Sequence, residues 1–175
     1  PTKEKDMQIP KAKYVTHHKK VLIDNKEFEK LMPPNQDVIS ELVPIIIQAE
    51  SSGNPLASDG KSFGLMGISE CVLKDYNNFS WRDFRKNDDP PFTKKYQAQY
   101  DISDLFSPSI NIEIGIWYLR KIQSWLPEEY KNSKTHLISG WNNGIGWLKK
   151  HNYEPPKSHK NKIYNRIYQD YWKRR

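Results

Sequence analysis

The chain has 175 residues, which suffices for one domain of ordinary size with a hydrophobic core of its own. Hydrophobic residues make up 36% of the chain and aromatic residues 13%, a composition that excludes a disordered, solvated chain. Lys and Arg total 28 against 21 Asp and Glu, so the formal net charge is +7 and we expect a basic, folded protein.

Residues 1–34 predict a basic N-terminal arm or linker. The segment is rich in lysine and ends at Pro33 and Pro34. Its one short apolar stretch, Val-Leu-Ile at residues 21–23, is the part that we expect to pack on the domain. Because the chain begins with Pro1 and contains no recognisable signal peptide, we expect that a leader or another domain has been removed.

Residues 35–175 predict the domain itself, and its first element is a helix. Asn35 or Asp37 is suited to cap the N-terminus of this helix. Apolar residues then recur at the helical period, at Val38, Ile39, Leu42, Val43, Ile46 and Ile47. Pro44, inside this stripe, predicts a kink or a restart of the helix. The turn-forming residues 51–55 (Ser-Ser-Gly-Asn-Pro) end it.

Further helices are predicted downstream, and strand signals are sparse. The expected ranges are 69–76, 107–126, 133–141 and 159–172. Residues 77–100 are polar and interrupted by prolines, and they predict no regular element. The fold class is therefore mostly α, with at most a small β-hairpin.

Glu50 stands out because it lies on the apolar face of the first helix. At 100° per residue it falls between Ile46 and Ile47, at the end of the buried stripe. Burial of a carboxyl raises its pKa toward the range in which it can donate a proton near neutral pH. Position alone also fits a glutamate that reaches solvent as the helix ends, or one that caps a neighbouring helix.

Four blocks, in order along the chain, carry a resemblance to a known family. They are Glu50-Ser51 at the helix end, Gly-Leu-Met-Gly-Ile at 64–68, Asn-Ile-Glu-Ile-Gly-Ile-Trp-Tyr-Leu at 111–119, and Gly-Trp-Asn-Asn-Gly-Ile-Gly at 140–146. With Asp-Leu-Phe-Ser-Pro at 104–108, this ordered set resembles the lytic transglycosylases related to goose-type lysozyme. A late helical Tyr that faces the catalytic Glu in that family matches Tyr164. The resemblance covers about residues 37–168.

The resemblance implies a lysozyme-like α+β fold, a helical bundle around a glycan-binding cleft. It implies a peptidoglycan lytic transglycosylase, which cuts the β-1,4 bond between N-acetylmuramic acid and N-acetylglucosamine without water. Glu50 then acts first as acid and afterwards as base, and the 6-hydroxyl of the sugar attacks to give a 1,6-anhydromuramoyl product. No second carboxylate, metal or organic cofactor is implied.

The substrate contacts that we expect come from the same blocks. They are Ser51, Met66, Ile68, Tyr118, Trp141, Asn142 and Tyr164. Ser51 is suited to hydrogen-bond either Glu50 or the N-acetyl group, and equally to bond the helix backbone. Tyr118 is adjacent to Trp117, so the two rings point to different faces and at least one belongs to the core. Asn142 suits a helix C-cap or recognition of a substrate amide.

The chain departs from the family pattern at three positions near the expected cleft. Gly67 stands where the family usually has a substrate-contacting Gln, so that contact is missing. Trp141 replaces a Tyr, which keeps an aromatic wall and loses a hydroxyl, and Asn143 replaces an Ala. Met66 and Ile68, on either side of Gly67, are expected to form the floor of the cleft. These changes bear on glycan preference and rate more than on the class of reaction.

Two other functions fit parts of the sequence. A goose-type lysozyme would hydrolyse the same bond with water and would pair Glu50 with a second carboxylate, for which Asp59 and Glu70 are the nearby candidates. Of the two, Asp59 resembles an Asp-bearing turn of goose-type lysozyme. Asp59 also stands in an Asp-Gly pair that predicts an ordinary turn. A basic polyanion-binding module would explain the net charge, yet it has no use for Glu50. No nucleic-acid motif is present, so no nucleic-acid partner is expected.

The resemblance to this family implies that the protein acts on peptidoglycan glycan strands, on the cell-wall side of the membrane. We therefore expect a periplasmic or extracellular location. Delivery by a phage particle or an envelope-spanning secretion assembly fits the same reading. The longest apolar run, residues 43–47, is far shorter than the ~20 residues of a membrane span, so no integral membrane segment is expected. His17 and His18 lack neighbouring ligands, so no metal site is expected. Cys71, the single cysteine, is expected to be buried.

Overall fold

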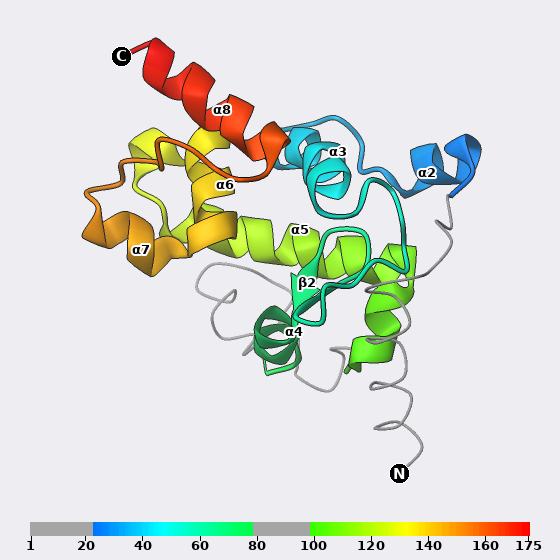
Figure 1. Ribbon diagram of the computed structural model, residues 1–175. Helices are drawn as coiled ribbons and strands as arrows, with labels where there is room; N and C mark the ends of the chain where they lie inside the picture. The colour runs from blue at the N-terminus through cyan, green and yellow to red at the C-terminus, as the bar shows by residue number, and fades with distance from the viewer. Residues whose placement is uncertain (1–22, 79–98) are drawn as a thin grey trace.

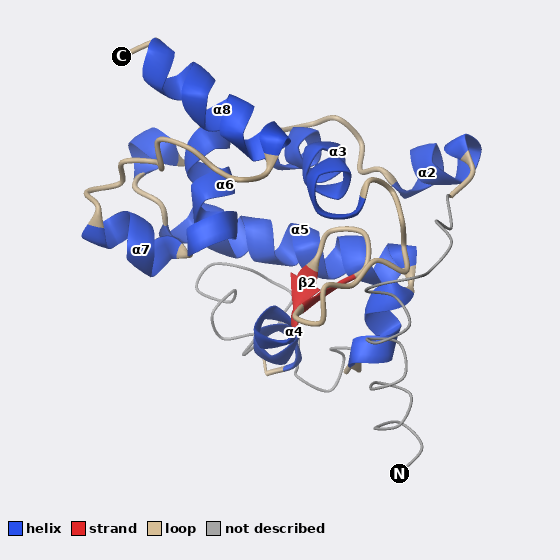
Figure 2. Ribbon diagram, viewed as in Figure 1, coloured by secondary structure: helices blue, strands red, loops and turns tan. Residues whose placement is uncertain are grey.

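The computed structural model describes residues 23–78 and 99–175, and these form a mostly helical fold with one small hairpin (Figure 2). The helices are α2 Asn25–Leu31, α3 Val38–Ser51, α4 Glu70–Asn77, α5 Pro108–Trp125, α6 Lys134–Asn143, α7 Ile145–Lys150 and α8 Lys162–Lys173, with 3-10 turns η3 Ile102–Phe106 and η4 Glu128–Tyr130. Strand β1, Ser62–Phe63, pairs antiparallel with β2, Ile68–Ser69. The predicted fold class, mostly α with at most a small β-hairpin, is confirmed.

Helix α5 runs through the middle of the molecule (Figure 1). Helices α3 and α8 lie on one side of it, and the hairpin and α4 lie on the other. The core between them is made of buried aliphatic residues from α3, the 63–68 turn, α5 and α6, with Tyr164 and Tyr168 of α8. Helix α5 therefore fixes the positions of α3 and of the hairpin, which carry two of the predicted motif blocks.

Helix α3 begins where the sequence predicts. The Asp37 side chain accepts a hydrogen bond from the Ser40 backbone N–H at 3.0 Å, and the Ser40 hydroxyl accepts one from the Asp37 N–H at 3.0 Å. This reciprocal cap satisfies two N–H groups that a helix start leaves free. Pro44 lies within one unbroken helix, so the predicted restart does not occur. The apolar stripe is buried on both sides of Pro44, and this packing outweighs the one backbone hydrogen bond that proline removes.

The turn between the two strands is fixed to α5 by a buried asparagine. The Asn111 carboxamide accepts a hydrogen bond from the Met66 N–H and donates to the carbonyls of Phe63 and Leu105, each at 2.8 Å. Gly64 has φ +78°, and a β-carbon there would collide with the Leu105 carbonyl and the Asn111 amide. Two of the predicted motif blocks, 64–68 and 111–119, therefore meet at this contact.

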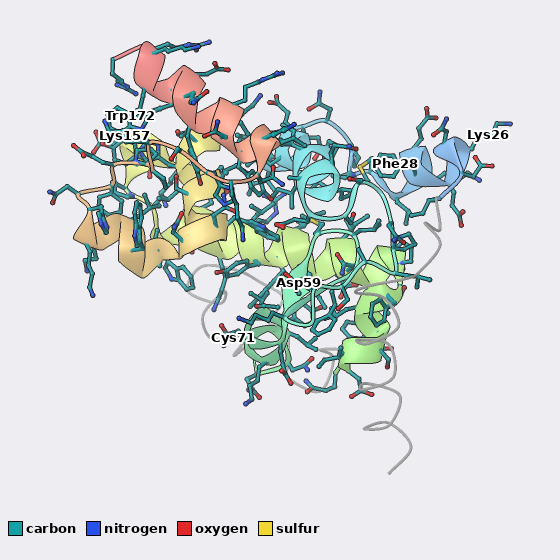
Figure 3. All side chains as sticks on the ribbon, in the orientation of Figure 1. Lys26, Phe28, Asp59, Cys71, Lys157 and Trp172 are labelled. Atoms are coloured by element: carbon teal, nitrogen blue, oxygen red, sulfur yellow. The ribbon has the colours of Figure 1, made fainter. Side chains whose placement is uncertain are left out.

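Some elements differ from the sequence-based expectation. Within the predicted arm, residues 1–22 lie outside the described residues, whereas α2 is a helix that the sequence analysis did not predict. Ile23 packs against the core, as expected for the end of the 21–23 stretch, and Phe28 of α2 packs there too, pointing toward the body while Lys26 points away (Figure 3). Helix α7 was also not predicted, because its six residues are too few to show a helical period.

One helix boundary and one burial prediction need correction. Helix α8 starts at Lys162 rather than at residue 159, because the Asn161 side chain caps it. Residues 79–98 of the polar 77–100 stretch lie outside the described residues. Cys71 is exposed on α4, contrary to the expectation of burial. The buried residue of α4 is Leu73, and a residue two positions earlier lies on the opposite side of the helix.

Candidate active site

A cavity of about 430 Å³ lies where α3, the hairpin, α6 and the start of α8 come together. It is open to solvent on one side and has a mixed polar and apolar lining. The lining residues are Glu50, Ser62, Gly67, Ile68, Ser69, Val72, Tyr118, Trp141, Asn142, His159, Lys160, Asn161 and Tyr164. The size and the mixed lining are those of a small-molecule or oligosaccharide site.

Glu50 projects from the last turn of α3 into this cavity. Glu50 as a whole residue is exposed, while its carboxyl group lies among protein groups at the cavity. Burial raises the pKa of Glu50 above its usual range, and hydrogen bonds from Tyr164 and Trp141 oppose that rise without cancelling it. The glutamate predicted from the helical period is therefore a cavity carboxyl with a raised pKa.

Tyr164 of α8 donates a hydrogen bond from its hydroxyl to Oε2 of Glu50, at 3.0 Å. Its ring is buried, and the burial together with the neighbouring carboxylate raises the pKa of the Tyr164 hydroxyl. The hydroxyl therefore stays protonated and remains a donor. This hydrogen bond agrees with the expectation that Tyr164 faces Glu50.

Asn161 links the end of α3 to the start of α8. Its Nδ2 donates to the Ala49 carbonyl at 2.9 Å, one residue before Glu50. Its Oδ1 accepts from the N–H groups of Ile163 and Tyr164, at 3.0 and 3.3 Å. One carboxamide thus satisfies a carbonyl at the end of α3 and caps the start of α8, which sets the distance between the carboxyl and the phenol.

The aromatic wall of the cavity comes from α5 and α6. The Tyr118 and Trp141 rings pack with centroids 5.5 Å apart, and both side chains line the cavity. Asn142 lines it as well, and its Nδ2 donates to the Tyr168 hydroxyl at 2.9 Å. Asn142 lies inside α6, whose C-cap is Gly144, so the C-cap reading of Asn142 does not hold.

Three predicted substrate contacts remain: Ile68, Met66 and Ser51. Only Ile68 lines the cavity. Met66 is fully buried beneath the turn, in the space that a β-carbon on Gly115 would occupy, so it supports the floor without forming it. The Ser51 hydroxyl donates to the Ile47 carbonyl at 3.0 Å and accepts from the Gly53 N–H at 3.2 Å, the backbone-bonded alternative.

Gly67 lies directly beside the Glu50 side chain. Its φ is +64°, and a β-carbon there would lie 3.1 Å from Cβ and 3.3 Å from Cδ of Glu50. The absence of a side chain at this position leaves the space beside the carboxyl open.

Asp59, the possible second carboxylate, is exposed in the loop before β1 (Figure 3). Its Oδ1 accepts hydrogen bonds from the N–H groups of Lys61 and Ser62, at 2.8 and 2.7 Å, as in the turn that its sequence context predicts. It does not line the cavity, although its charge makes the smallest contribution to the raised pKa of Glu50.

Sequence reasoning missed one wall of the cavity, formed by His159, Lys160 and Asn161. These residues belong to an irregular segment, in which no periodic pattern marks the inward face. The one available signal was the asparagine itself, because Asn is a preferred N-cap residue. Among residues 23–78 and 99–175, no group of three His, Cys, Asp or Glu side chains is arranged to hold a metal ion.

A cavity carboxyl of raised pKa is suited to acid chemistry on a ligand bound beside it. Residues 34–164 match the transglycosylase SLT domain family, and the chain belongs to that family. It is therefore a glycan-cleaving enzyme of the lytic transglycosylase class, acting on peptidoglycan of the cell wall. Searches of curated proteins and of solved structures gave no match. Within the described residues, no helix combines the length and apolarity of a membrane span.

Proposed function

We propose that this protein cleaves the β-1,4 bond between N-acetylmuramic acid and N-acetylglucosamine with Glu50 as its catalytic acid and base, leaving a 1,6-anhydromuramoyl end. The observation that carries the proposal is that Glu50 is the one carboxyl among the described residues that line the cavity. Its raised pKa supports a protonated form at the pH of the reaction.

In the first step Glu50 acts as the acid. Tyr164 donates to Oε2, which leaves Oε1 as the oxygen that carries the proton toward the glycosidic oxygen. As the bond between C1 of the muramoyl residue and this oxygen breaks, the proton moves to the leaving 4-oxygen of N-acetylglucosamine. The Tyr164 hydroxyl and the Trp141 indole N–H then stabilise the carboxylate that forms.

In the second step the same carboxylate acts as the base. The 6-hydroxyl of the muramoyl residue attacks C1, and its proton returns to Glu50. The C1–O6 bond replaces the C1–O4 bond, and no water is consumed. One carboxyl therefore suffices for both steps, whereas a hydrolase of the two-carboxylate kind needs a partner about 5–9 Å away.

The exposed position of Asp59 supports the one-carboxylate mechanism over a lysozyme mechanism in which Asp59 would be the second carboxylate. Its Oδ1 is engaged by two backbone N–H groups, and its side chain lies outside the cavity lining. A nucleophile or base would have to reach the anomeric carbon or its attacking water from within the cavity.

The test compares Glu50→Gln with Asp59→Asn on purified cell-wall sacculi. Glu50→Gln should reduce release of soluble muropeptides by at least about 100-fold, because the amide cannot donate the proton. Asp59→Asn should retain most of the activity, since its charge only adds to the pKa of Glu50. Equal activity of wild type and Glu50→Gln would overturn the assignment of the acid, and loss in Asp59→Asn would favour the lysozyme mechanism.

A cell-wall substrate places the proposed reaction in the periplasm or outside the cell. Delivery there as part of a phage particle or of an envelope-spanning secretion assembly is compatible with this proposal, and residues 1–33 precede the family match.

A further inference from the structure

Residues 159–161, which come directly before α8, form one wall of the cavity, and this wall carries positive charge. His159 and Lys160 are neighbours in this wall, and the charge of Lys160 contributes to lowering the pKa of His159. Among the described residues the ion pairs join Arg120 to Asp37 and Lys134 to Glu41, so neither occupies Lys160. The Lys160 ammonium group therefore lines the cavity without an acidic partner in the described part of the chain. It is available to bind an anionic group of a ligand.

His159 adds a neutral donor beside this ammonium group. Its Nδ1 accepts a hydrogen bond from the Asn161 backbone N–H at 2.9 Å, so the ring proton resides on Nε2. Burial, more than the neighbouring charge, lowers the pKa of His159, which keeps the ring neutral near pH 7. The ring is held between α8 residues, with centroid distances of 5.2 Å to Tyr164 and 6.2 Å to Tyr168. The wall therefore combines one fixed donor with one cation.

The charge of the whole chain favours the same wall. Residues 145–175 contain nine Lys and Arg against two Asp and Glu, and the 144 residues before them contain nineteen of each sign. The net charge of +7 thus equals the charge of residues 145–175, which comprise α7, α8, the segment between them and the two C-terminal arginines. An anionic ligand that approaches the cavity from this end is attracted before it makes contact.

We propose that Lys160, with His159 beside it, binds a carboxylate carried by the muramoyl residue of the glycan strand. The inference rests on the proposed function, because that function puts a muramoyl residue in the cavity. Two carboxylates have the required chemistry, the lactyl group of a strand without peptide and the peptide stem of a strand that bears one. Lys160 is thus a specificity residue that distinguishes muramoyl strands from neutral N-acetylglucosamine polymers.

The test measures binding, so that it does not depend on cleavage. Titration calorimetry compares Glu50→Gln with Glu50→Gln/Lys160→Gln on three soluble ligands: peptide-bearing strand fragments, the same fragments after removal of the peptides, and N-acetylglucosamine oligomers. The matched control is Glu50→Gln/Lys162→Gln, since Lys162 is exposed, lies two residues away and does not line the cavity.

Lys160→Gln should weaken binding of an anionic fragment by about three- to five-fold, the size of one solvent-accessible ion pair. It should leave the neutral oligomer unaffected, and Lys162→Gln should change neither. A loss confined to peptide-bearing fragments assigns the stem carboxylate, and a loss confined to stripped fragments assigns the lactyl group. Equal binding with and without Lys160, an equal loss on the neutral oligomer, or an equal loss in the Lys162 control would overturn the inference.

Failure of the proposed function gives a different result. In that case the wild-type chain would release no muropeptides from sacculi, whatever the binding data show. The carboxylate site would then remain as a glycan-binding site without the proposed chemistry.

Discussion

The Glu50 carboxyl is subject to opposing influences within its cavity. Burial favours the neutral acid, while the Tyr164 hydroxyl and the Trp141 indole favour the carboxylate. Burial is the largest of these, so the pKa is raised. In the proposed mechanism, the same arrangement that favours the protonated acid before reaction provides hydrogen-bond donors to the carboxylate after proton transfer.

The raised pKa predicts a pH-dependent stability difference between wild type and Glu50→Gln. Because the folded-state pKa exceeds the unfolded one, the contribution of Glu50 to stability is present below the usual value of 4.5 and is lost as pH rises through the folded pKa. Glu50→Gln should therefore have a higher Tm than wild type at neutral pH, and the difference should shrink in acid. Thermal unfolding followed by circular dichroism measures this, and a difference independent of pH would contradict it.

Removal of the Tyr164 hydroxyl should raise the pKa of Glu50 further. In Tyr164→Phe the bond that stabilises the carboxylate is lost, so the alkaline limb of the kcat/KM profile should move to higher pH. The rate at the optimum should fall about ten-fold or more, as for loss of a hydrogen bond to a charged group. Tyr171→Phe, on the same helix and outside the cavity lining, serves as the control. An unmoved alkaline limb would show that the bond does not tune the acid.

At this scale the helical period drew attention to Glu50, because α3 is long and its stripe is regular, but the assignment also needed the four ordered motif blocks. The roles of Ser51 and Met66 were harder to predict. A serine at a helix end bonds the nearest carbonyl as readily as a ligand, and Ser51 does so. Met66 and Ile68 are both buried apolar residues of the same turn, and Ile68 lines the cavity whereas Met66 does not.

The relation between α3 and α8 depends on one carboxamide at the start of α8. Asn161→Ala removes both the cap of α8 and the bond to the Ala49 carbonyl, and we expect a loss of about 1–3 kcal/mol in the free energy of unfolding. Asn161→Asp keeps a capping acceptor and removes only the donor to Ala49, so its loss should be smaller. Both should lower kcat, because Tyr164 shifts relative to Glu50. Urea unfolding and turnover on sacculi measure the two effects, and full activity in Asn161→Asp would exclude the positioning role.

The turn at residues 64–68 depends on Asn111 in a similar way. Asn111→Ala removes all three hydrogen bonds that fix the buried turn to α5, so the free energy of unfolding should fall by about 3 kcal/mol or more. Asn143→Ala, an exposed asparagine in α6, is the matched control and should change it by less than about 0.5 kcal/mol. Urea unfolding gives both values, and similar losses in the two variants would contradict the role assigned to Asn111.

The long helices α3 and α5 could be predicted because each has a cap or a first-turn proline and a regular apolar stripe. Helices α2 and α7 escaped prediction because seven and six residues are too few to establish a period. Both short helices are held in place by tertiary packing of a few apolar side chains, among them Phe28 and Leu148.

Charge is distributed unevenly over the whole molecule, with the positive excess at the C-terminal end. The Lys157 ammonium lies over the Trp172 ring, 3.1 Å from its centroid, at the edge of the molecule (Figure 3). The sequence supplied the count of charges, but the place of Lys160 on the cavity wall required the three-dimensional fold.

This asymmetry predicts salt-sensitive binding of the whole protein to cell-wall sacculi. The Glu50→Gln chain should release from sacculi as salt rises from about 50 to about 500 mM, because screening weakens attraction between exposed charges. Binding to neutral chitin should change little over the same range. A sedimentation assay with both polymers measures the difference, and equal salt dependence on the two would contradict the prediction.

The central claim is that one carboxyl performs both steps and that the sugar, not water, closes the reaction. Digestion of sacculi in water labelled with heavy oxygen, followed by mass spectrometry of the soluble products, tests it directly. We predict muropeptides with 1,6-anhydro ends and no label. Reducing ends that carry one labelled oxygen would contradict the claim and identify a hydrolase.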